Sequence, residues 1–436
     1  MEVLLHGYEV NRPTWFYLST ILILAVYLRF NRWWSLRNLD LLLILAASPG
    51  LLFLHEGSGN LGYGWLYVTT CVFLVRILID PVLHRRPYLG QNMTPGGLGF
   101  LCLAAFAFLM TQAITKAPPD STQRTVEHAD SLLHRTATDP QFPRVDEVDP
   151  GPAAAVIAAP VGWVFDDLTA RILAILGHAA VIIGLWFVGR NLFADSSLGL
   201  GMATLYLLLP CTAYNVGEFN HVLPAALIVW AFVSYRRPLV SGTLLGFACG
   251  TMYFPVLLLP MWTAFYGRKG AWRFAAALLG VAVILTTSIA LTSADPDSFV
   301  TKTLGTLDLA VLAFIDGERT AGFWRESDYL SAYRLPIMVS YAVMVVLMTI
   351  FPRKRTVETL LAQSTAVIVG TQLWFTQQGG VYLLWYLPLL LMIVFRPRLM
   401  QLSFPEVGET LSTAVAIRGT DGANLKPRAN SMQTFR

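Results

Sequence analysis

Long apolar runs, separated by short polar junctions, are the feature that most constrains how this chain can fold. The runs are Thr14–Phe30, Leu39–Leu54, Gly62–Leu83, Gly96–Thr115, Thr169–Gly189, Ser197–Pro210, Phe219–Tyr235, Val240–Tyr266, Trp272–Thr292, Leu335–Ile350, Glu358–Phe375 and Gly380–Phe395. A helix needs about 20 apolar residues to cross the hydrocarbon core of a bilayer, so the runs predict a polytopic helical membrane protein. Charged residues make up 13% of the chain, against about 25% in soluble domains. This composition excludes a soluble enzyme, a disordered chain and a nucleic-acid-binding protein.

Basic residues gather at alternate junctions between the runs. They are Arg29, Arg32, Arg37, Arg76, Arg85, Arg86, Arg190, Arg236, Arg237, Arg268, Lys269, Arg273, Arg353, Lys354, Arg355, Arg396 and Arg398. The intervening short junctions, at His55–Asn60, Cys211–Asn220 and Thr376–Gly379, contain no Lys or Arg. Because short basic junctions stay in the cytoplasm, we predict an outer N-terminus and a cytoplasmic C-terminus, in the inner (plasma) membrane of a bacterium.

The run Val240–Tyr266 has basic junctions on both sides, so a single span does not satisfy the charge rule. Gly250 and Pro255 flank a point where a helix would break. We predict two short helices that meet near Met252, as a hairpin or a re-entrant pair, which gives about 13 transmembrane helices. A proline kink in one long tilted helix is the alternative, since proline is common in membrane helices.

Two long segments are predicted to lie outside the membrane. The first, Lys116–Leu168, includes the short apolar stretch Ala153–Phe165, which is typical of an interfacial or re-entrant helix. The second is Ser293–Arg334. We divide the all-α chain into an N-terminal three-helix membrane extension (1–95), a transmembrane core (96–400) and a disordered cytoplasmic tail (401–436).

Most of the unusual polar chemistry falls on the predicted outer side. The candidate general bases are Asp120, Asp130 and Glu218, and the candidate substrate-binding residues are Asn220, His221, Tyr253, Arg319, Arg325, Arg334, Gln378 and Tyr382. Carboxylates act as general bases and arginines bind phosphate, so together they suit transfer from a phosphorylated donor. For any one of these residues, an ordinary solvated loop charge is the alternative interpretation. At Glu218 that alternative is a carboxylate stabilised by a helix N-terminus.

Other polar residues carry weaker hypotheses. His178, alone in an apolar run, is more typical of a hydrogen-bonded packing residue than of a functional one. The acidic run Asp146-Glu147-Val148-Asp149 offers oxygen ligands for a divalent metal, but such runs are usually solvated. We therefore predict neither a metal site nor a cofactor. The four cysteines, which form no C-x-x-C pair, are predicted to be packing residues.

From Gly96 to Arg398 the chain resembles the membrane glycosyltransferases of the GT-C superfamily. The resemblance is nearest to the polyprenol-phosphate-mannose-dependent α-mannosyltransferases of glycosyltransferase family 87. Three stretches carry it: GPAAAVIAAPVGWVF before TARILAIL, then LYLLLPCTAYNVGEFNHVLPAALIVWAFVSYRRPLVSGTLLGFACGTMYFPVLLLPMWTAFYGRKGAWRF, and finally GGVYLLWYLPLLLMIVF. The chain departs from the family at Pro150-Gly151-Pro152, where Tyr-Pro-Pro is usual, and at Met252, where lysine is frequent.

The resemblance implies a polyprenyl-phosphate donor of a mannose-like sugar and a lipid or glycan acceptor. It also implies inverting transfer to an acceptor hydroxyl on the extracytoplasmic face, with an essential carboxylate in the first large outer loop. Arg319, Arg325 and Arg334 would stabilise the leaving phosphate. Two alternatives stay open: a transporter or flippase for a lipid-linked or small polar solute, because broken helices also occur in transporters, and a non-catalytic membrane scaffold.

Overall fold

The structure is a computed structural model, which describes residues 11–31, 33–83, 89–136, 150–300, 322–326, 333–351, 355–375, 380–397 and 399. These residues form helices joined by short connections and contain no β-strand, which confirms the predicted all-α class. The α-helices are α2 (Arg12–Tyr27), α3 (Leu36–His55), α4 (Gly59–Ile79), α5 (Pro95–Thr115), α6 (Asp120–His134), α7 (Pro152–Phe165), α8 (Thr169–Asn191), α9 (Ser196–Leu208), α10 (Pro210–Tyr214), α11 (Phe219–Val233), α12 (Pro238–Thr251), α13 (Leu259–Leu291), α15 (Phe323–Glu326), α16 (Arg334–Ile350), α17 (Val357–Trp374) and α18 (Leu383–Phe395). Three 3-10 turns are η1 (Asp80–Val82), η2 (Asp166–Leu168) and η3 (Phe254–Leu258).

Several described helices suit a membrane. Five segments are long and apolar enough to cross one: Leu36–His55, Gly59–Ile79, Pro95–Thr115, Pro152–Asn191 and Phe254–Leu291. Five shorter helices, α9, α11, α12, α16 and α18, are apolar as well. An integral membrane protein follows from these helices, whereas the count of 13 spans and the orientation of the termini stay predictions.

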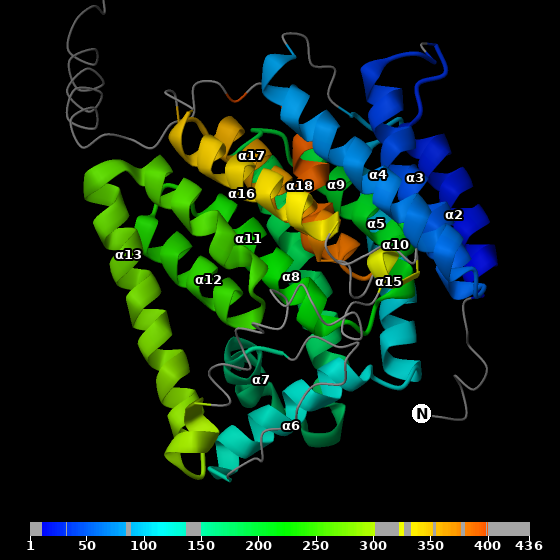
Figure 1. Cartoon of the computed structure of the whole chain (residues 1–436). Coiled ribbons are helices and arrows are strands. Elements are labelled where there is room, and N and C mark those ends of the chain that lie inside the picture. The colour runs from blue at the N-terminus through cyan, green and yellow to red at the C-terminus, as the bar shows by residue number, and fades with distance from the viewer. Residues whose placement is uncertain are drawn as a thin grey trace, which may run out of the picture.

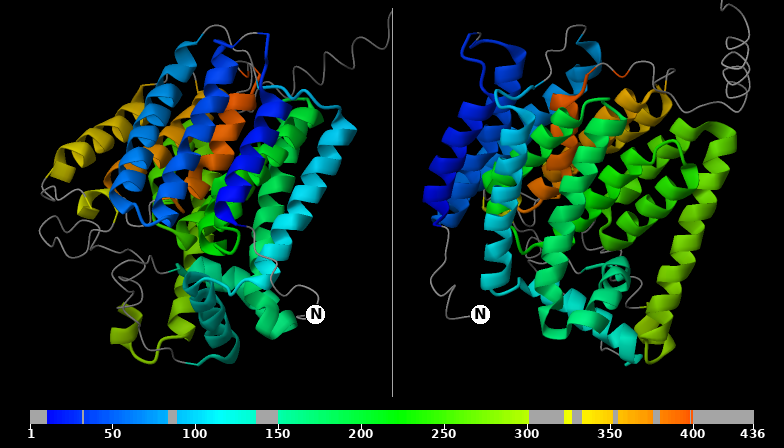
Figure 2. Two further views of the ribbon diagram at one scale, coloured as in Figure 1. Left: turned by 90° about the vertical axis from the view of Figure 1, so that its right-hand side faces the viewer. Right: turned by 180° about the vertical axis from the view of Figure 1, so that it is seen from behind.

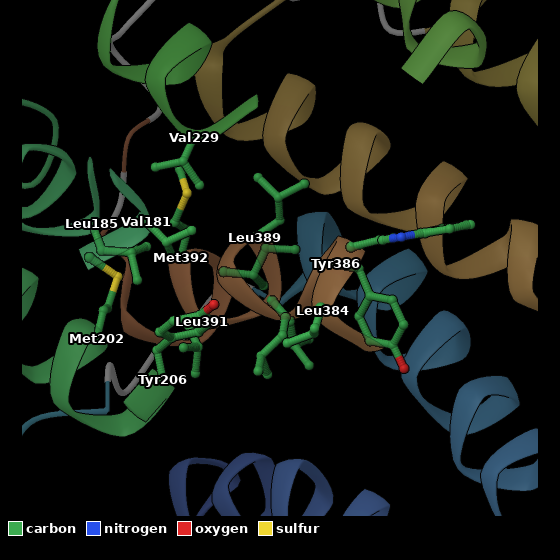
Figure 3. Close-up of a cluster of buried hydrophobic side chains, with 14 of the residues drawn as sticks. Val181, Leu185, Met202, Tyr206, Val229, Leu384, Tyr386, Leu389, Leu391 and Met392 are labelled. Atoms are coloured by element: carbon green, nitrogen blue, oxygen red, sulfur yellow. The ribbon is translucent and has the colours of Figure 1, made fainter. Parts of the chain in front are cut away.

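Helix α18 forms the centre of the bundle. All of its residues, Leu383–Phe395, are buried, and they are almost entirely apolar. Figure 3 shows Leu384, Leu389 and Met392 of α18 among side chains from α8, α9 and α11. A helix that is apolar on every side suits either lipid or a protein core, and the burial of every residue shows that other helices surround this one.

Helices α6 and α7 lie together at one end of the bundle, which we call the α6–α7 end (Figure 1). Figure 2 shows the same two helices projecting beyond the bundle in two further views, beside the end of α13. α7 corresponds to the stretch Ala153–Phe165 that was expected to form a short helix outside the main spans.

The predicted break near Met252 is present. α12 ends at Thr251, Met252 is extended (φ −147°, ψ 158°), and Pro255 is the second residue of the turn η3. A second break follows inside α13, at Gly267 (φ 61°, ψ −175°). This left-handed φ value favours glycine, because a side chain would clash with the backbone there.

The chain reverses direction between these two breaks. Along α12, Gly242, Gly246 and Gly250 lie successively against Phe274, Val281 and Leu285. α12 and the part of α13 after Gly267 therefore run in parallel, and the segment between them must run back. The predicted pair of helices that meet near Met252 is confirmed, and the single kinked helix is wrong.

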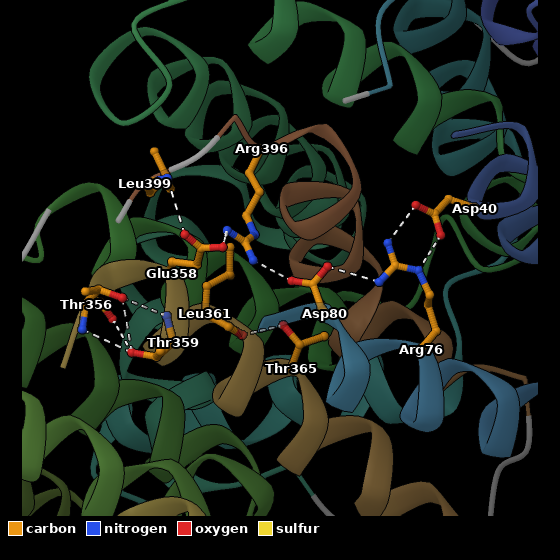
Figure 4. A network of polar contacts seen from close by, with 10 residues as sticks. All are labelled: Asp40, Arg76, Asp80, Thr356, Glu358, Thr359, Leu361, Thr365, Arg396 and Leu399. Carbon is orange, nitrogen blue, oxygen red and sulfur yellow. Dashed lines mark hydrogen bonds and ion pairs between the residues drawn. The ribbon is translucent and has the colours of Figure 1, made fainter. Parts of the chain in front are cut away.

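A chain of buried charges at the opposite end ties the first helices to the last (Figure 4). Arg76 of α4 donates to Asp40 of α3 at 2.6 and 2.8 Å and to Asp80 at 3.0 Å. Arg396, directly after α18, pairs with Asp80 and with Glu358 of α17. The N-terminal helices are thereby joined to the core through ion pairs as well as through apolar packing.

Candidate active site

Helix α6 lies across the beginning of α11. Four of its buried residues, Ser121, Thr122, Thr125 and Ala129, fall on one face, at the spacing of an amphipathic helix. The hydroxyl of Thr122 donates to the carbonyl of Gly217 at 3.0 Å. The residues that precede α11 are therefore covered by α6.

Asn220 fixes α6 to α11. Its Oδ1 accepts a hydrogen bond from the hydroxyl of Thr125 at 2.8 Å, and its Nδ2 donates to the carbonyl of Ser121 at 2.8 Å. The side chain is buried, so both bonds form where water does not compete. The predicted substrate-binding residue Asn220 is thus placed to position α6, which it holds over Glu218.

Glu218 lies at the N-cap position of α11, directly beneath α6. Its Oε2 accepts a hydrogen bond from the hydroxyl of Ser121 at 3.1 Å, and 21% of its side chain is exposed. Burial raises the pKa of this carboxyl group above its usual range, and the negative charge of Asp120 raises it further, while the Ser121 bond lowers it. A carboxylate with a raised pKa is a stronger base than an ordinary glutamate.

His221, one turn into α11, is held by Trp385 of α18. The indole Nε1 donates to Nδ1 of His221 at 3.0 Å. An indole nitrogen only donates, so Nδ1 must accept, and a neutral ring then carries its proton on Nε2. Nε2 lies 4.0 Å from Oε2 of Glu218, so the protonated nitrogen faces the carboxylate.

An aromatic array extends from His221 away from α6. We use this name for Tyr253, Phe375, Tyr382 and Trp385. Tyr382 stacks on Trp385 at 4.1 Å and on Phe375 at 5.6 Å, and Tyr253 contacts the edge of Phe375 at 4.7 Å between ring centroids. The array packs residues at the start of η3, the end of α17 and the start of α18 against one another beside the histidine.

Arg334 lies at the far side of the aromatic array. Its Nε and Nη2 donate to the carbonyl oxygen of Trp374 at 3.2 and 2.9 Å. The ring of Trp374 in turn lies 6.3 Å from that of Tyr253. The guanidinium group is buried, and its position is set by the end of α17.

Glu218 also lines a cavity of 120 Å³. Its lining residues come from the start of α2, the end of α5 and the segment that follows it, the start of α8, and the end of α10 with the segment before α11. They are Arg12, Gln112, Ala113, Lys116, Ala117, Pro118, Pro119, Ala170, Arg171, Ala174, Ala213, Tyr214, Asn215, Val216, Gly217 and Glu218. Glu218 therefore adjoins both a basic cavity and the histidine that packs against the aromatic array.

The structure thus brings together six of the predicted site residues, namely Glu218, Asn220, His221, Tyr253, Arg334 and Tyr382. Asp120 is exposed at the first position of α6, close enough to Glu218 to act on it electrostatically. Asp130 is not part of this group, because it lies ten residues further along α6, exposed and paired with exposed His134 at 3.0 Å. Arg319 and Gln378 lie outside the described residues, and of Arg325 only the backbone, in α15, is described.

The sequence interpretation missed Ser121, Thr125, Trp385 and the basic residues of the cavity. A signal existed for two of them, since Ser121 and Thr125 are one turn apart in a segment of mixed polarity. Trp385 lies in an apolar run where nothing distinguishes it from a packing residue. Its role depends on a partner more than 160 positions away.

The remaining predictions concern His178 and metal binding. His178 is completely buried and bonded through both ring nitrogens, to the hydroxyl of Tyr206 at 2.9 Å and the carbonyl of Val216 at 3.1 Å, as expected for a packing histidine. Within the described ranges, no group of three or more His, Cys, Asp or Glu residues could hold a metal ion. The acidic run at Asp146–Asp149 lies outside those ranges.

The glycine at position 151, where the resembled family usually has proline, has a structural reason. Its amide donates to the carbonyl of Thr251 at 3.1 Å, and a Cβ at this position would lie 2.1 Å from the carbonyl oxygen of Gly250. Only glycine lets the beginning of α7 approach the end of α12 so closely.

Comparison with known proteins assigns the chain to a family. Neither a curated protein nor a solved structure matches it. The sequence pattern of Glycosyltransferase family 87 matches residues 151–376, which is more than half of the 436 residues and includes Glu218, His221, Tyr253 and Arg334. The chain therefore belongs to glycosyltransferase family 87.

Proposed function

We propose that this glycosyltransferase moves a mannose-like sugar from a polyprenyl-phosphate donor to an acceptor hydroxyl, with inversion, and that Glu218 is the general base. The observation that carries the proposal is the placement of Glu218. It is a half-buried carboxylate with a raised pKa that adjoins a cavity on one side and His221 on the other. A base must reach the proton that it removes, and a cavity beside the carboxylate gives an acceptor that access.

The reaction needs one proton transfer and one displacement at the sugar carbon. The acceptor hydroxyl gives its proton to the Glu218 carboxylate, and its oxygen forms a bond to the anomeric carbon as the bond from that carbon to the phosphate oxygen breaks. Polyprenyl phosphate leaves with the bonding electrons. Inversion follows because the nucleophile enters opposite to the leaving group, and no covalent enzyme intermediate is formed.

Two features indicate that the donor binds beside His221. Phe375, Tyr382 and Trp385 are buried and pack around the partly exposed ring of Tyr253, and an aromatic ring near polar groups is common in small-molecule sites. Arg334 lies behind Tyr253 and Trp374, where a guanidinium could move toward a phosphate. We assign the aromatic array and Arg334 to the donor, and we retain Arg319, Arg325 and Gln378 as predicted donor contacts.

We also propose that the α6–α7 end faces the extracytoplasmic side of a bacterial plasma membrane. Arg236, Arg237 and Arg268 border the hairpin at the end away from α6, which fits a cytoplasmic location for that end. The polar site residues gather where α6 covers the start of α11 rather than midway along the spans. This location supports transfer at the membrane surface over transport through the membrane.

Membranes from cells that express the chain would test the proposal. They would be supplied with polyprenyl phosphates that carry different radiolabelled sugars, and label in extracted lipids and glycans would be measured. We expect incorporation from at least one donor with the unaltered chain and its loss with Glu218→Gln. Incorporation that is equal with and without the chain, across all donors, would contradict the proposal.

A further inference from the structure

The basic cavity beside Glu218 has an excess of positive charge. Arg12, Lys116 and Arg171 line it, against the one carboxylate of Glu218. Arg171 has no carboxylate within ion-pair distance among the residues described, and the guanidinium of Arg12 donates to a histidine ring nitrogen, Nδ1 of His55, at 2.8 Å rather than to a described carboxylate. A small cavity with three cations at its walls favours an anionic ligand.

A buried amide in the same wall points to such a ligand independently. Gln112 of α5 is only 2% exposed, and its Nε2 has no hydrogen-bond partner in the described part of the chain. A buried donor without a partner is costly, so its presence in a cavity wall indicates a group that it would bind. An N–H donor requires an acceptor oxygen, which an oxyanion provides.

Arg12 reaches the cavity from outside the region that matches the family. The family match begins at residue 151, whereas Arg12 is the first residue of α2. The hydroxyl of Tyr214 donates to the backbone carbonyl of Arg12 at 2.8 Å, and the ring of His55 lies 5.4 Å from that of Tyr214. These contacts fix the start of α2 against the segment that leads to Glu218.

We propose that this cavity binds a phosphate-type oxyanion on the acceptor, and that the N-terminal helices complete the acceptor site through Arg12. The inference rests on the proposed function, because the acceptor must present its hydroxyl to the base. The aromatic array lies on the His221 side of Glu218 and is assigned to the donor. Glu218 itself lines the cavity, and the three cations and the Gln112 amide in its walls select an acceptor that carries a compact anion.

Ligand binding to the purified full chain in phosphatidylcholine nanodiscs would test this without any catalytic readout. The probes are a short-chain phosphatidic acid, inorganic phosphate, a short polyprenyl phosphate and, as the neutral control, short-chain phosphatidylcholine. Arg12→Gln and Arg171→Gln should each weaken phosphatidic acid binding about tenfold, because each removes a charge-assisted contact. Arg135→Gln, an exposed arginine at the end of α6 that does not line the cavity, is the matched control and should bind as the unaltered chain does.

The outcomes separate this inference from the proposed function. If sugar transfer is never detected but Arg12→Gln still weakens phosphatidic acid binding, the anion site is supported and the proposed enzymatic function is contradicted. If the two arginine variants weaken polyprenyl phosphate binding and leave phosphatidic acid binding unchanged, the cavity belongs to the donor and the acceptor assignment is wrong. If neither variant differs from Arg135→Gln with any probe, inorganic phosphate included, the cavity is not an anion site.

Discussion

The indole N–H of Trp385 donates to Nδ1 of His221 at 3.0 Å and thereby directs the other ring nitrogen toward Glu218. One residue lies in the last described helix and the other in α11, near the middle of the chain. Both are buried, so the bond is protected from water. The tautomer of the histidine next to the proposed base is therefore set by the packing of two distant helices.

Replacing Trp385 with phenylalanine removes this donor while an aromatic ring is kept. We expect the free energy of unfolding to fall by about 1–3 kcal/mol, because Nδ1 of His221 loses its partner in a buried site. Transfer activity should fall as well. Without the indole donor, the proton of the neutral ring is no longer confined to Nε2, the nitrogen that faces Glu218. Thermal unfolding and sugar transfer would be measured beside Trp163→Phe, whose side chain is 80% exposed on α7 and which should leave both unchanged.

The pH dependence of transfer should follow the pKa of Glu218. The rate should rise with pH as this carboxyl group ionises, and the rise should lie above the range of an ordinary glutamate because burial raises the pKa. Asp120→Asn removes a negative charge that raises the pKa, so the rise should move to lower pH. Ser121→Ala removes a hydrogen bond that lowers the pKa, so the rise should move to higher pH.

A pH–rate profile of the three proteins would check these opposite shifts. Glu127→Gln, which removes an exposed charge from the same helix, is the control and should not move the profile. Shifts in the same direction for Asp120→Asn and Ser121→Ala would show that the profile does not report Glu218.

Gly151→Ala should destabilise the protein, because the new Cβ would lie 2.1 Å from the carbonyl oxygen of Gly250. Backbone atoms on both sides must shift, for which we expect a cost of about 1–3 kcal/mol. Gly280→Ala in α13 is the matched control, since nothing lies within 4 Å of its Cβ. Thermal unfolding in detergent would compare the two, and equal stability would contradict the close approach of α7 and α12.

Arg396→Met, at the end of the bundle opposite to α6 and α7, should lower the free energy of unfolding more than Gly151→Ala does. The substitution leaves the carboxylates of Asp80 and Glu358 near each other without the cation between them. Removing one partner of a buried ion pair costs about 3–5 kcal/mol. Arg190→Met, an exposed arginine 5.5 Å from the ring of Trp186, should have little effect on the unfolding temperature and serves as the control.

Much of the fold follows from local sequence properties. Run length and apolar composition place the helices, and the charge rule correctly demands a reversal near Met252. The charge chain through Arg76 and Arg396 was not predicted, because it pairs residues from helices far apart in sequence. From the sequence alone, basic residues at a junction are expected to be solvated. Only the packing of the helices around them shows that they are enclosed and paired.

The site divides in the same way. Glu218, Asn220 and His221 are adjacent in sequence and polar in an apolar context, so they are found without the fold. The choice among the loop carboxylates depends on the packing of α6, which separates Asp120 from Asp130. The contribution of Arg12 depends on how the N-terminal helices pack against the segment before α11, which no local pattern encodes.

The most direct test of the account is the transfer rate of the purified chain in nanodiscs, with saturating donor and acceptor, for the unaltered protein, Glu218→Gln and Asp120→Asn. If Glu218 is the general base, Glu218→Gln should slow transfer by about 10²–10⁴-fold. Asp120→Asn should have a much smaller effect and act mainly through the pH profile. A Glu218→Gln protein that keeps the unaltered rate, while Asp120→Asn abolishes transfer, would contradict the central claim.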